Sequence, residues 1–328
     1  GADHPDTLNT RNNLAGAYRS VGRFGKAVEL FEQVLAERER LLGADHPDTL
    51  NTRDSLAGAY ESAGRLAEAI DAWEELLLDC QRVLGADHPD TLNTRNNLAV
   101  AYYSVGRFGE AIELFERVLD ERERVLGADH PDTLNTRNNL AVAYKSVGRF
   151  GEAIELFEQV LAERKRLLGA DHPDTLNTRN NLAGAYYSVG RLAEVLDAWE
   201  ELLLDCQRVL GADHPVTLTV RNNLAVAYKS VGRFGEAIEL FEQVLAERKR
   251  LLGADHPDTL NTRNNLAGAY ESAGRFAEAI DAWEKLLPDC QRVLGLEHPL
   301  TKLVQKNLEA AKRKMNPPDA PSPETGED

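Results

Sequence analysis

Histidine, cysteine and carboxylate residues are the side chains of this chain that could bind a metal ion or carry out catalysis. The 328 residues include eight histidines and three cysteines, which are Cys80, Cys206 and Cys290. The histidines are widely spaced along the chain, and no two cysteines have the spacing of a metal or redox site. We therefore predict no metal and no cofactor. An odd, sparse set of thiols favours a reducing, cytoplasmic compartment.

The sequence contains no recognisable catalytic motif. His-Pro-Asp, the tripeptide of J-domains, occurs six times, but every copy stands where a helix is expected to begin. The segment 22–26 lacks the glycine spacing of a phosphate-binding loop and has no strand before it. No Gly-x-Ser-x-Gly motif or isolated pair of carboxylates is present. We predict that the chain is not an enzyme.

Pairs of asparagines are the clearest candidates for binding. Asparagine is a poor residue for a helix interior, so its repetition needs a reason. An amide carries both a donor and an acceptor, which can pair with the backbone of an extended peptide of any sequence. Alternatively, one asparagine of each pair bonds to the neighbouring repeat and only adjusts the stacking. The pairs are Asn12-Asn13, Asn96-Asn97, Asn138-Asn139, Asn180-Asn181, Asn222-Asn223 and Asn264-Asn265, and Asp54-Ser55 interrupts the series.

Two further positions vary while their neighbours hardly change. One position holds Arg19, Glu61, Tyr103, Lys145, Tyr187, Lys229 and Glu271, and the other alternates between glycine and valine from Gly16 onward. Such variation is expected where a groove reads out the side chains of a ligand, or where solvated sites drift. The combination of lysine and tyrosine favours an acidic or aromatic-containing segment as the ligand. The candidate partner-binding residues are Asn96, Asn97, Tyr103, Asn138, Asn139, Lys145, Asn180, Asn181, Tyr187, Asn222, Asn223 and Lys229.

These candidates recur because the whole chain is periodic. A Gly-Ala-Asp-His-Pro start occurs every 42 residues from Gly1 to Gly253, with a degenerate copy at Gly295. A fixed period of this size is typical of a repeat architecture. The repeats are 1–42, 43–84, 85–126, 127–168, 169–210, 211–252 and 253–294, followed by a cap helix within 295–315.

Each repeat is predicted to form two helices. Pro5 suits a first helical turn, with Asp3 or His4 as the cap, and apolar residues then recur at intervals of three and four. Gly22 suits the residue that ends this helix, and a second helix is expected over residues 24–42. One hairpin cannot bury its own apolar stripe, whereas stacked hairpins can. We predict an all-α protein, a right-handed α-solenoid (superhelix) of seven 42-residue helix-turn-helix repeats plus a C-terminal capping helix.

The two ends differ in polarity. The last helix carries five lysine and arginine side chains and is expected to close the stack, so residues 1–315 would form a single solenoid. The acidic, proline-rich residues 316–328 are expected to be disordered. The first repeat has no polar cap. Its outer face is expected to meet an upstream segment or to allow end-to-end self-association.

The net charge excludes two classes of partner. The formal charge is −16, which repels nucleic acid and anionic membrane surfaces unless basic groups are segregated. No apolar run approaches the roughly 18 residues that span a bilayer. We predict no nucleic acid and no membrane partner.

Three other columns, meaning sets of equivalent residues 42 positions apart, are expected to have mainly structural roles. Arg11 and its equivalents lie beside the apolar stripe, where an ion pair with a second-helix acid or a basic ladder for an anionic partner is expected. Arg38 falls in the last turns of the second helix, where a cation suits the helix dipole. Trp73, Trp199 and Trp283 replace Phe31, and the three cysteines replace Arg38, as packing variants. The cysteines are two or three repeats apart, too far for a disulfide.

The repeat also resembles a known family. The residues that carry the resemblance are Asn13-Leu14-Ala15-Gly16-Ala17-Tyr18, Gly22-Arg23-Phe24, Ala27 and Phe31. This pattern resembles the tetratricopeptide repeat, in a 42-residue form similar to kinesin light chains and to the C-terminal arrays of bacterial NTPase regulators. It departs from the usual pattern at Arg11 and Ala15. The resemblance implies a scaffold that binds a protein or extended peptide in a concave groove lined by the first helices.

Two other functions remain open at this point. One is a sensor or regulatory arm of a larger bacterial signalling NTPase, and the other is a self-assembling structural array. The periodicity and the resemblance fit all three functions, because fold alone does not define function.

Overall fold

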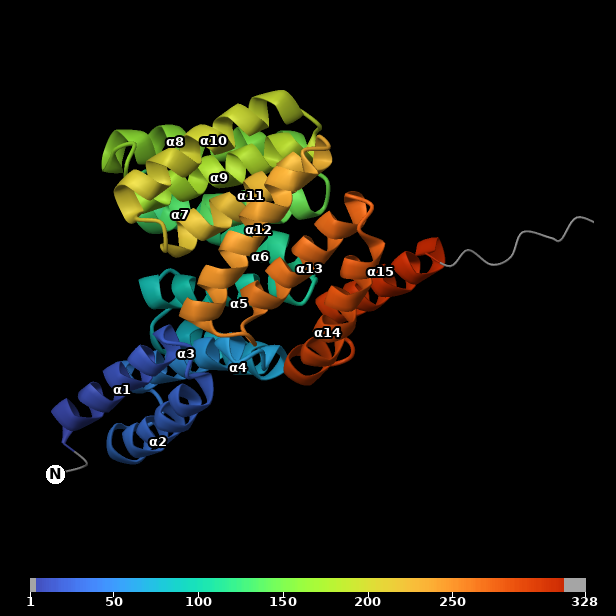
Figure 1. The fold of residues 1–328 in the computed structure, drawn as a ribbon. Coiled ribbons are helices and arrows are strands. Elements are labelled where there is room, and N and C mark those ends of the chain that lie inside the picture. The colour runs from blue at the N-terminus through green and yellow to red at the C-terminus, as the bar shows by residue number, and fades with distance from the viewer. Residues whose placement is uncertain (1–3, 316–328) are drawn as a thin grey trace, which may run out of the picture. The chain divides into compact units, whose positions relative to one another are not determined.

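Residues 4–315, which this computed structural model describes, fold into fifteen α-helices and contain no strand (Figure 1). They form two bodies that meet in sequence between Ser188 and Val189. The N-terminal body holds α1 (Pro5–Ser20), α2 (Phe24–Leu42), α3 (Pro47–Ser62), α4 (Leu66–Val83), α5 (Pro89–Ser104), α6 (Phe108–Leu126), α7 (Pro131–Ser146), α8 (Phe150–Leu168) and α9 (Pro173–Ser188). The C-terminal body holds α10 (Leu192–Leu210), α11 (Pro215–Ser230), α12 (Phe234–Leu252), α13 (Pro257–Ser272), α14 (Phe276–Leu294) and α15 (Pro299–Met315).

The histidine before each proline begins the first helix of a repeat. His46 has an extended backbone, and its Nδ1 atom accepts a hydrogen bond from the Asp48 N–H at 3.1 Å. Pro47 follows as the first helical residue, where no N–H is required. His4 occupies the same place in the first repeat, which decides between the two predicted caps. The repeated histidines are therefore helix caps.

Glycines separate the helices within and between the hairpins. Gly106 (φ +81°) stands between α5 and α6, and Gly127 (φ +93°) ends α6. Residues with a Cβ atom rarely adopt such angles, so glycine sets both ends of the second helix. The predicted span 24–42 of the first such helix is confirmed.

Helices pack in chain order within each body. Every helix contacts the next, and first helices also contact first helices, as α5 does with α7 and α11 with α13. Within either body, the described second helices make no such contact with one another. The first helices therefore form the inner layer of each body. This arrangement confirms a solenoid of helical hairpins with a 42-residue period.

Neighbouring hairpins share one apolar core. Phe115 and Phe157 are at most 1% exposed and lie in a cluster with Leu140 and Leu182. Leu56 lies in the cluster of Phe31 from the preceding repeat and is buried, whereas the equivalent Leu14 is 46% exposed. A hairpin therefore buries its own leucine only when another hairpin precedes it, as expected for stacked repeats.

A tyrosine near the end of each internal first helix joins two repeats. The Tyr144 hydroxyl donates to Glu116 of the preceding repeat at 2.6 Å, and the Arg149 guanidinium lies 3.8 Å from the ring centroid. Burial, followed by the hydrogen bond to Glu116, raises the Tyr144 pKa to about 12. Lys312 replaces this tyrosine in α15 and forms an ion pair with Glu284 at 2.6 Å. The same link is thus kept in the last helix with different chemistry.

Two expectations are not decided by this structure. The tail 316–328 lies outside the described residues. A single solenoid over 1–315 stays a prediction.

Candidate partner-binding face

The inner layer of each body carries the predicted binding residues. In the N-terminal body α5 contributes Asn96, Asn97 and Tyr103, α7 contributes Asn138, Asn139 and Lys145, and α9 contributes Asn180, Asn181 and Tyr187. Asn222, Asn223 and Lys229 lie on α11 in the C-terminal body. Since α5 contacts α7 and α7 contacts α9, nine of the twelve side chains belong to three adjacent helices.

In five of the six pairs, a hydrogen bond joins the first asparagine to the next repeat. Asn138 is 7% exposed, and its side-chain oxygen accepts from Asn181 Nδ2 at 3.3 Å. Asn222 is 7% exposed and accepts from Asn265 at 3.4 Å. This bonding confirms the structural alternative for one member of the pair. Contact with a partner stays a prediction. The partly exposed second asparagines of α5, α7 and α9 are the remaining candidates for it.

Asp54 interrupts the series of asparagine pairs, but it keeps the bond to the next repeat through a carboxyl group in place of the amide. Asp54 accepts from Trp73 Nε1 at 2.9 Å and from Asn97 Nδ2 at 3.1 Å. Burial raises the pKa of the Asp54 carboxyl group, and the two donors oppose that shift. The second repeat therefore holds a shielded carboxyl group where other repeats hold an amide.

From the second repeat to the seventh, the variable position near the end of the first helix is partly buried, whereas Arg19 in the first repeat is exposed. The Tyr103 hydroxyl lies 2.8 Å from Ser146 Oγ of the next repeat. Desolvation lowers the pKa of Lys145, and no carboxylate pairs with its ammonium group within residues 4–315. Desolvation also lowers the pKa of Lys229, with Glu271 opposing it. An ammonium group in such a setting gains by meeting a carboxylate.

The two variable positions are coupled across repeats, a relationship that the sequence analysis did not detect. Arg19 Nη1 lies 2.5 Å from where a Cβ atom of residue 58 would stand, and Lys229 Nζ lies 3.6 Å from the same point at Gly268. At position 58 glycine thus makes room for a long cation from the preceding repeat, whereas a Cβ atom at position 268 would lie in ordinary contact with Lys229. The sequence follows the same division in six pairs. A long cation goes with glycine in Arg19/Gly58, Lys145/Gly184 and Lys229/Gly268. Glutamate or tyrosine goes with valine in Glu61/Val100, Tyr103/Val142 and Tyr187/Val226.

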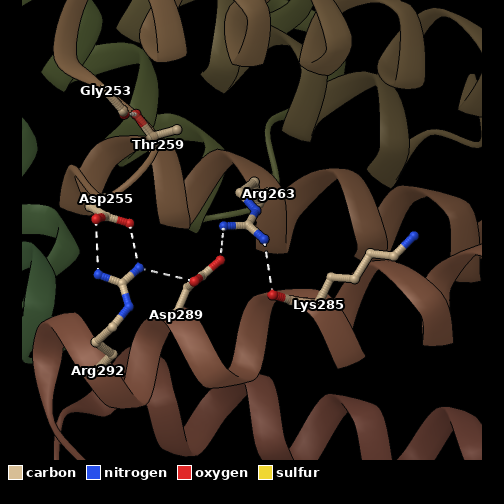
Figure 2. A network of polar contacts seen from close by, with 7 residues as sticks. All are labelled: Gly253, Asp255, Thr259, Arg263, Lys285, Asp289 and Arg292. Atoms are coloured by element: carbon tan, nitrogen blue, oxygen red, sulfur yellow. Dashed lines mark hydrogen bonds and ion pairs between the residues drawn. The ribbon is translucent and has the colours of Figure 1, made fainter.

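Four equivalents of Arg11 form ion pairs with acids of the second helices, as one of the two interpretations predicts: Arg53, Arg95, Arg137 and Arg263. Arg11 itself donates to Gln33 at 2.8 Å. Arg53 pairs with Asp79 at 2.6 Å, and Arg95, which is 4% exposed, pairs with Glu121. Figure 2 shows that Arg263 contacts Asp289 and the Lys285 carbonyl, while Arg292 joins Asp289 to Asp255. These guanidinium groups are already engaged within the chain, which disfavours a basic ladder for an anionic partner.

Arg38 has a role that was not predicted from the sequence. Arg38 is 3% exposed and donates to the Asp48 carbonyl at 2.8 Å, to Thr52 Oγ1 at 2.6 Å and to Asn9. It therefore bonds the next hairpin and does not simply complement a helix dipole. The signal for this role was present, because Arg38 and its equivalents always stand 14 residues before a threonine.

Other predicted packing variants are confirmed. Trp73, Trp199 and Trp283 are at most 3% exposed. The three cysteines are buried and free.

No group of three or more metal-binding side chains comes together in the described part of the chain. None of the helices between residues 4 and 315 is long and apolar enough to cross a bilayer.

Comparison with known proteins gives one family over most of the chain. A tetratricopeptide repeat model matches residues 6–77, 55–120, 102–164, 146–203, 180–249 and 230–288. Kinesin light chain-related 2 from Arabidopsis thaliana is 49% identical over 43 residues, which are 13% of this chain and 6% of the plant protein.

Solved structures show the same type of fold. A putative kinesin light chain from Podosopora anserina with nearly identical TPR-like repeats is 34% identical, with a TM-score of 0.54 over 63% of this chain and 98% of that one. BtubC (BKLC) from P. vanneervenii is 22% identical, with a TM-score of 0.52 over 80% of this chain and 98% of that one. A Rap protein complexed with Competence and Sporulation Factor is 12% identical, with a TM-score of 0.56 over 94% and 99% of the two chains.

Proposed function

Because the chain belongs to the tetratricopeptide repeat family, whose members generally mediate protein–protein interactions, we propose that it is a non-catalytic scaffold for an extended polypeptide segment. The segment lies along the first helices of the N-terminal body, across α5, α7 and α9. The Rap protein, which shares only the fold, was crystallised with a bound factor, so an array of this kind is able to hold a second molecule.

One observation carries the proposal. Asn97, Asn139 and Asn181 recur at a 42-residue interval on three adjacent helices, and all three are partly exposed. An amide that bonds within the protein through one group still offers another to a backbone N–H or C=O. A row of such amides binds the main chain of a ligand without regard to its sequence. Family membership alone would not single out this row.

Lys145 supplies the selectivity. Its partly buried ammonium group lies on the central helix of the three and lacks a carboxylate partner in the described residues. A carboxylate of the ligand would stabilise the charged form of this ammonium group, which burial disfavours. The whole chain carries a charge of −16, so this acidic contact is local and works against the overall field. We propose a segment with one acidic residue facing Lys145.

The experiment is selection of binders from a random peptide library on the purified protein, followed by affinity measurement with variants. Lys145→Glu is expected to weaken acidic binders at least about tenfold, because attraction becomes repulsion in a partly shielded site. Lys165→Glu, at an exposed position on α8, is the matched control and is expected to change little. Equal affinities of the two variants would remove Lys145 from the site. Failure of every selected peptide to depend on Asn139 or Asn181 would remove the proposal.

A further inference from the structure

Four buried arginines of the second helices share one set of acceptors. Each donates to a backbone carbonyl and a threonine hydroxyl in the next hairpin, and to a polar side chain in its own. For Arg164 the distances are 3.1 Å to the Asp174 carbonyl, 2.8 Å to Thr178 Oγ1 and 2.5 Å to Asn135 Oδ1. Arg38, Arg122 and Arg248 repeat this pattern, with Thr219 in place of the asparagine for Arg248. These acceptors form a guanidinium site that the chain fills itself.

Where cysteine replaces the arginine, the acceptor usually changes too. Cys206 is followed 14 residues later by Val220, and Cys290 by Val304. Both valines are fully buried, so the polar site has become apolar packing. Arginine therefore goes with threonine, and cysteine goes with valine.

Cys80 breaks this rule. Residue 94, which stands 14 residues after it, is a threonine, and Cys80 Sγ lies 3.9 Å from Thr94 Oγ1. Thr94 also donates to the Asp90 carbonyl at 3.0 Å, as Thr52 does to the Asp48 carbonyl beneath Arg38. The second repeat thus keeps the arrangement of the guanidinium site around a side chain too short to occupy it.

A cavity of about 90 Å³ lies at this place. Its lining includes Asn51, Asp90 and Thr94, which are the equivalents of the three residues that hold Arg38, together with Cys80 and Asp54. The carboxyl group of Asp54 stands where other repeats have an uncharged amide. Asn51 and Asp90 are exposed, so the cavity can be reached from solvent. It combines the acceptors of a guanidinium site with a nearby acid.

We propose that this cavity binds the guanidinium group of an arginine side chain from a partner protein. The planar group would donate to Asn51, to the Asp90 carbonyl and to Thr94 as the internal arginines do in four other repeats, and Asp54 would add attraction. The net charge of −16 favours a cationic group on approach. This site does not depend on the proposed segment across α5, α7 and α9, and either could exist without the other.

The test is a titration followed by nuclear magnetic resonance of the asparagine side-chain amides. N-ethylguanidinium, a shortened arginine side chain, is added at concentrations too low to denature the protein. We expect saturable shifts at Asn51 and at least about tenfold weaker binding of ethylammonium, which lacks the planar fork. Acetyl-Gly-Arg-Gly-amide should bind at least as well as N-ethylguanidinium. If N-ethylguanidinium binds and this peptide does not, the proposal that an arginine side chain occupies the cavity is overturned.

Two variants define the site, and both follow residues that the chain already uses. Cys80→Arg restores the internal arginine and is expected to abolish the saturable shifts. Thr94→Val copies the cysteine–valine pairs and is expected to weaken binding at least about tenfold, because one hydrogen bond to a charged donor is lost. Circular dichroism checks that both variants remain folded. Unchanged binding in folded Cys80→Arg, or no saturable shift in the unmodified protein, would overturn the proposal.

Discussion

The guanidinium group of Arg19 lies over Gly58 of the next repeat, at the point where a side chain of residue 58 would begin. Lys229 also approaches Gly268 in the C-terminal body, at 3.6 Å from the point where a Cβ atom would stand. A long cation and a glycine therefore act as one unit across the joint between two hairpins. Packing at these joints offers a structural reason for the glycine–valine alternation, and readout of a ligand at these positions stays a prediction.

This pairing predicts energetic coupling between residues 19 and 58. Gly58→Val should destabilise the protein more when Arg19 is present than when Arg19 is replaced by alanine, by about 0.5–1 kcal/mol. The reason is that Arg19 must leave its position to admit the valine. A double-mutant cycle in urea measures the difference. Additive effects of the two substitutions would show that the contact has no energetic weight.

The buried Arg122 network predicts a large cost and a specific rescue. Arg122→Cys should lower the free energy of unfolding by about 2–4 kcal/mol, because Thr136 and the Asp132 carbonyl lose their charged donor. Adding Thr136→Val should recover part of this loss by copying the Cys206/Val220 pair. Urea denaturation of the three proteins measures it.

Arg124→Ala is the matched control for that series. Arg124 stands two residues from Arg122, is exposed and pairs with Asp87 at the surface. Its removal should leave the free energy of unfolding nearly unchanged, since exposed ion pairs contribute little. A loss as large as that of Arg122→Cys would show that burial is not the source of the effect.

The tyrosine links predict a loss of stability in alkaline solution. The pKa values of Tyr102, Tyr144, Tyr228 and Tyr270 are each raised to about 12, mainly by burial. The unfolded chain has tyrosine pKa values of about 10, so the contribution is complete below pH 10 and is lost as the pH rises toward 12. Tyr144→Phe should make this fall shallower. Ultraviolet titration of tyrosinate together with urea midpoints at each pH tests both statements, and titration of all tyrosines near pH 10 in the folded protein would contradict them.

The histidine caps predict a modest and chemically selective effect. His130→Ala should cost about 1 kcal/mol, because the Asp132 N–H loses its acceptor, which lies 3.2 Å away. His130→Asn should cost much less, since its side-chain oxygen can accept the same bond. Thermal unfolding of the two variants separates capping from general packing. Equal losses would indicate that the histidine ring, and not its acceptor, matters.

Local chemistry made the fold predictable from the sequence. The proline and glycine of each repeat set helix ends within one or two residues, and the predicted span 24–42 agrees with α2. Such signals act over one helical turn and need no knowledge of neighbours. The stacking followed from apolar stripes that one hairpin cannot bury.

The site was harder to predict because its contacts join residues of different repeats. Asn138 and Asn181 stand 43 residues apart and bond at 3.3 Å, and Arg38 bonds Thr52 of the next hairpin. A helical period identifies which face a residue occupies, but not which residue of the next repeat it meets. Comparing columns across the repeats would have shown the arginine–threonine and cation–glycine pairs.

Photo-crosslinking from the first helices tests the central claim most directly. A benzophenone side chain is placed at position 103 or 187, on the proposed binding face, or at position 155 on the exposed surface of α8 as the control. With an acidic peptide selected on the unmodified protein, we predict efficient crosslinks from 103 and 187 and few from 155. Each crosslinked peptide residue should fall on the same segment. Crosslinks mainly from position 155 would contradict binding along the first helices.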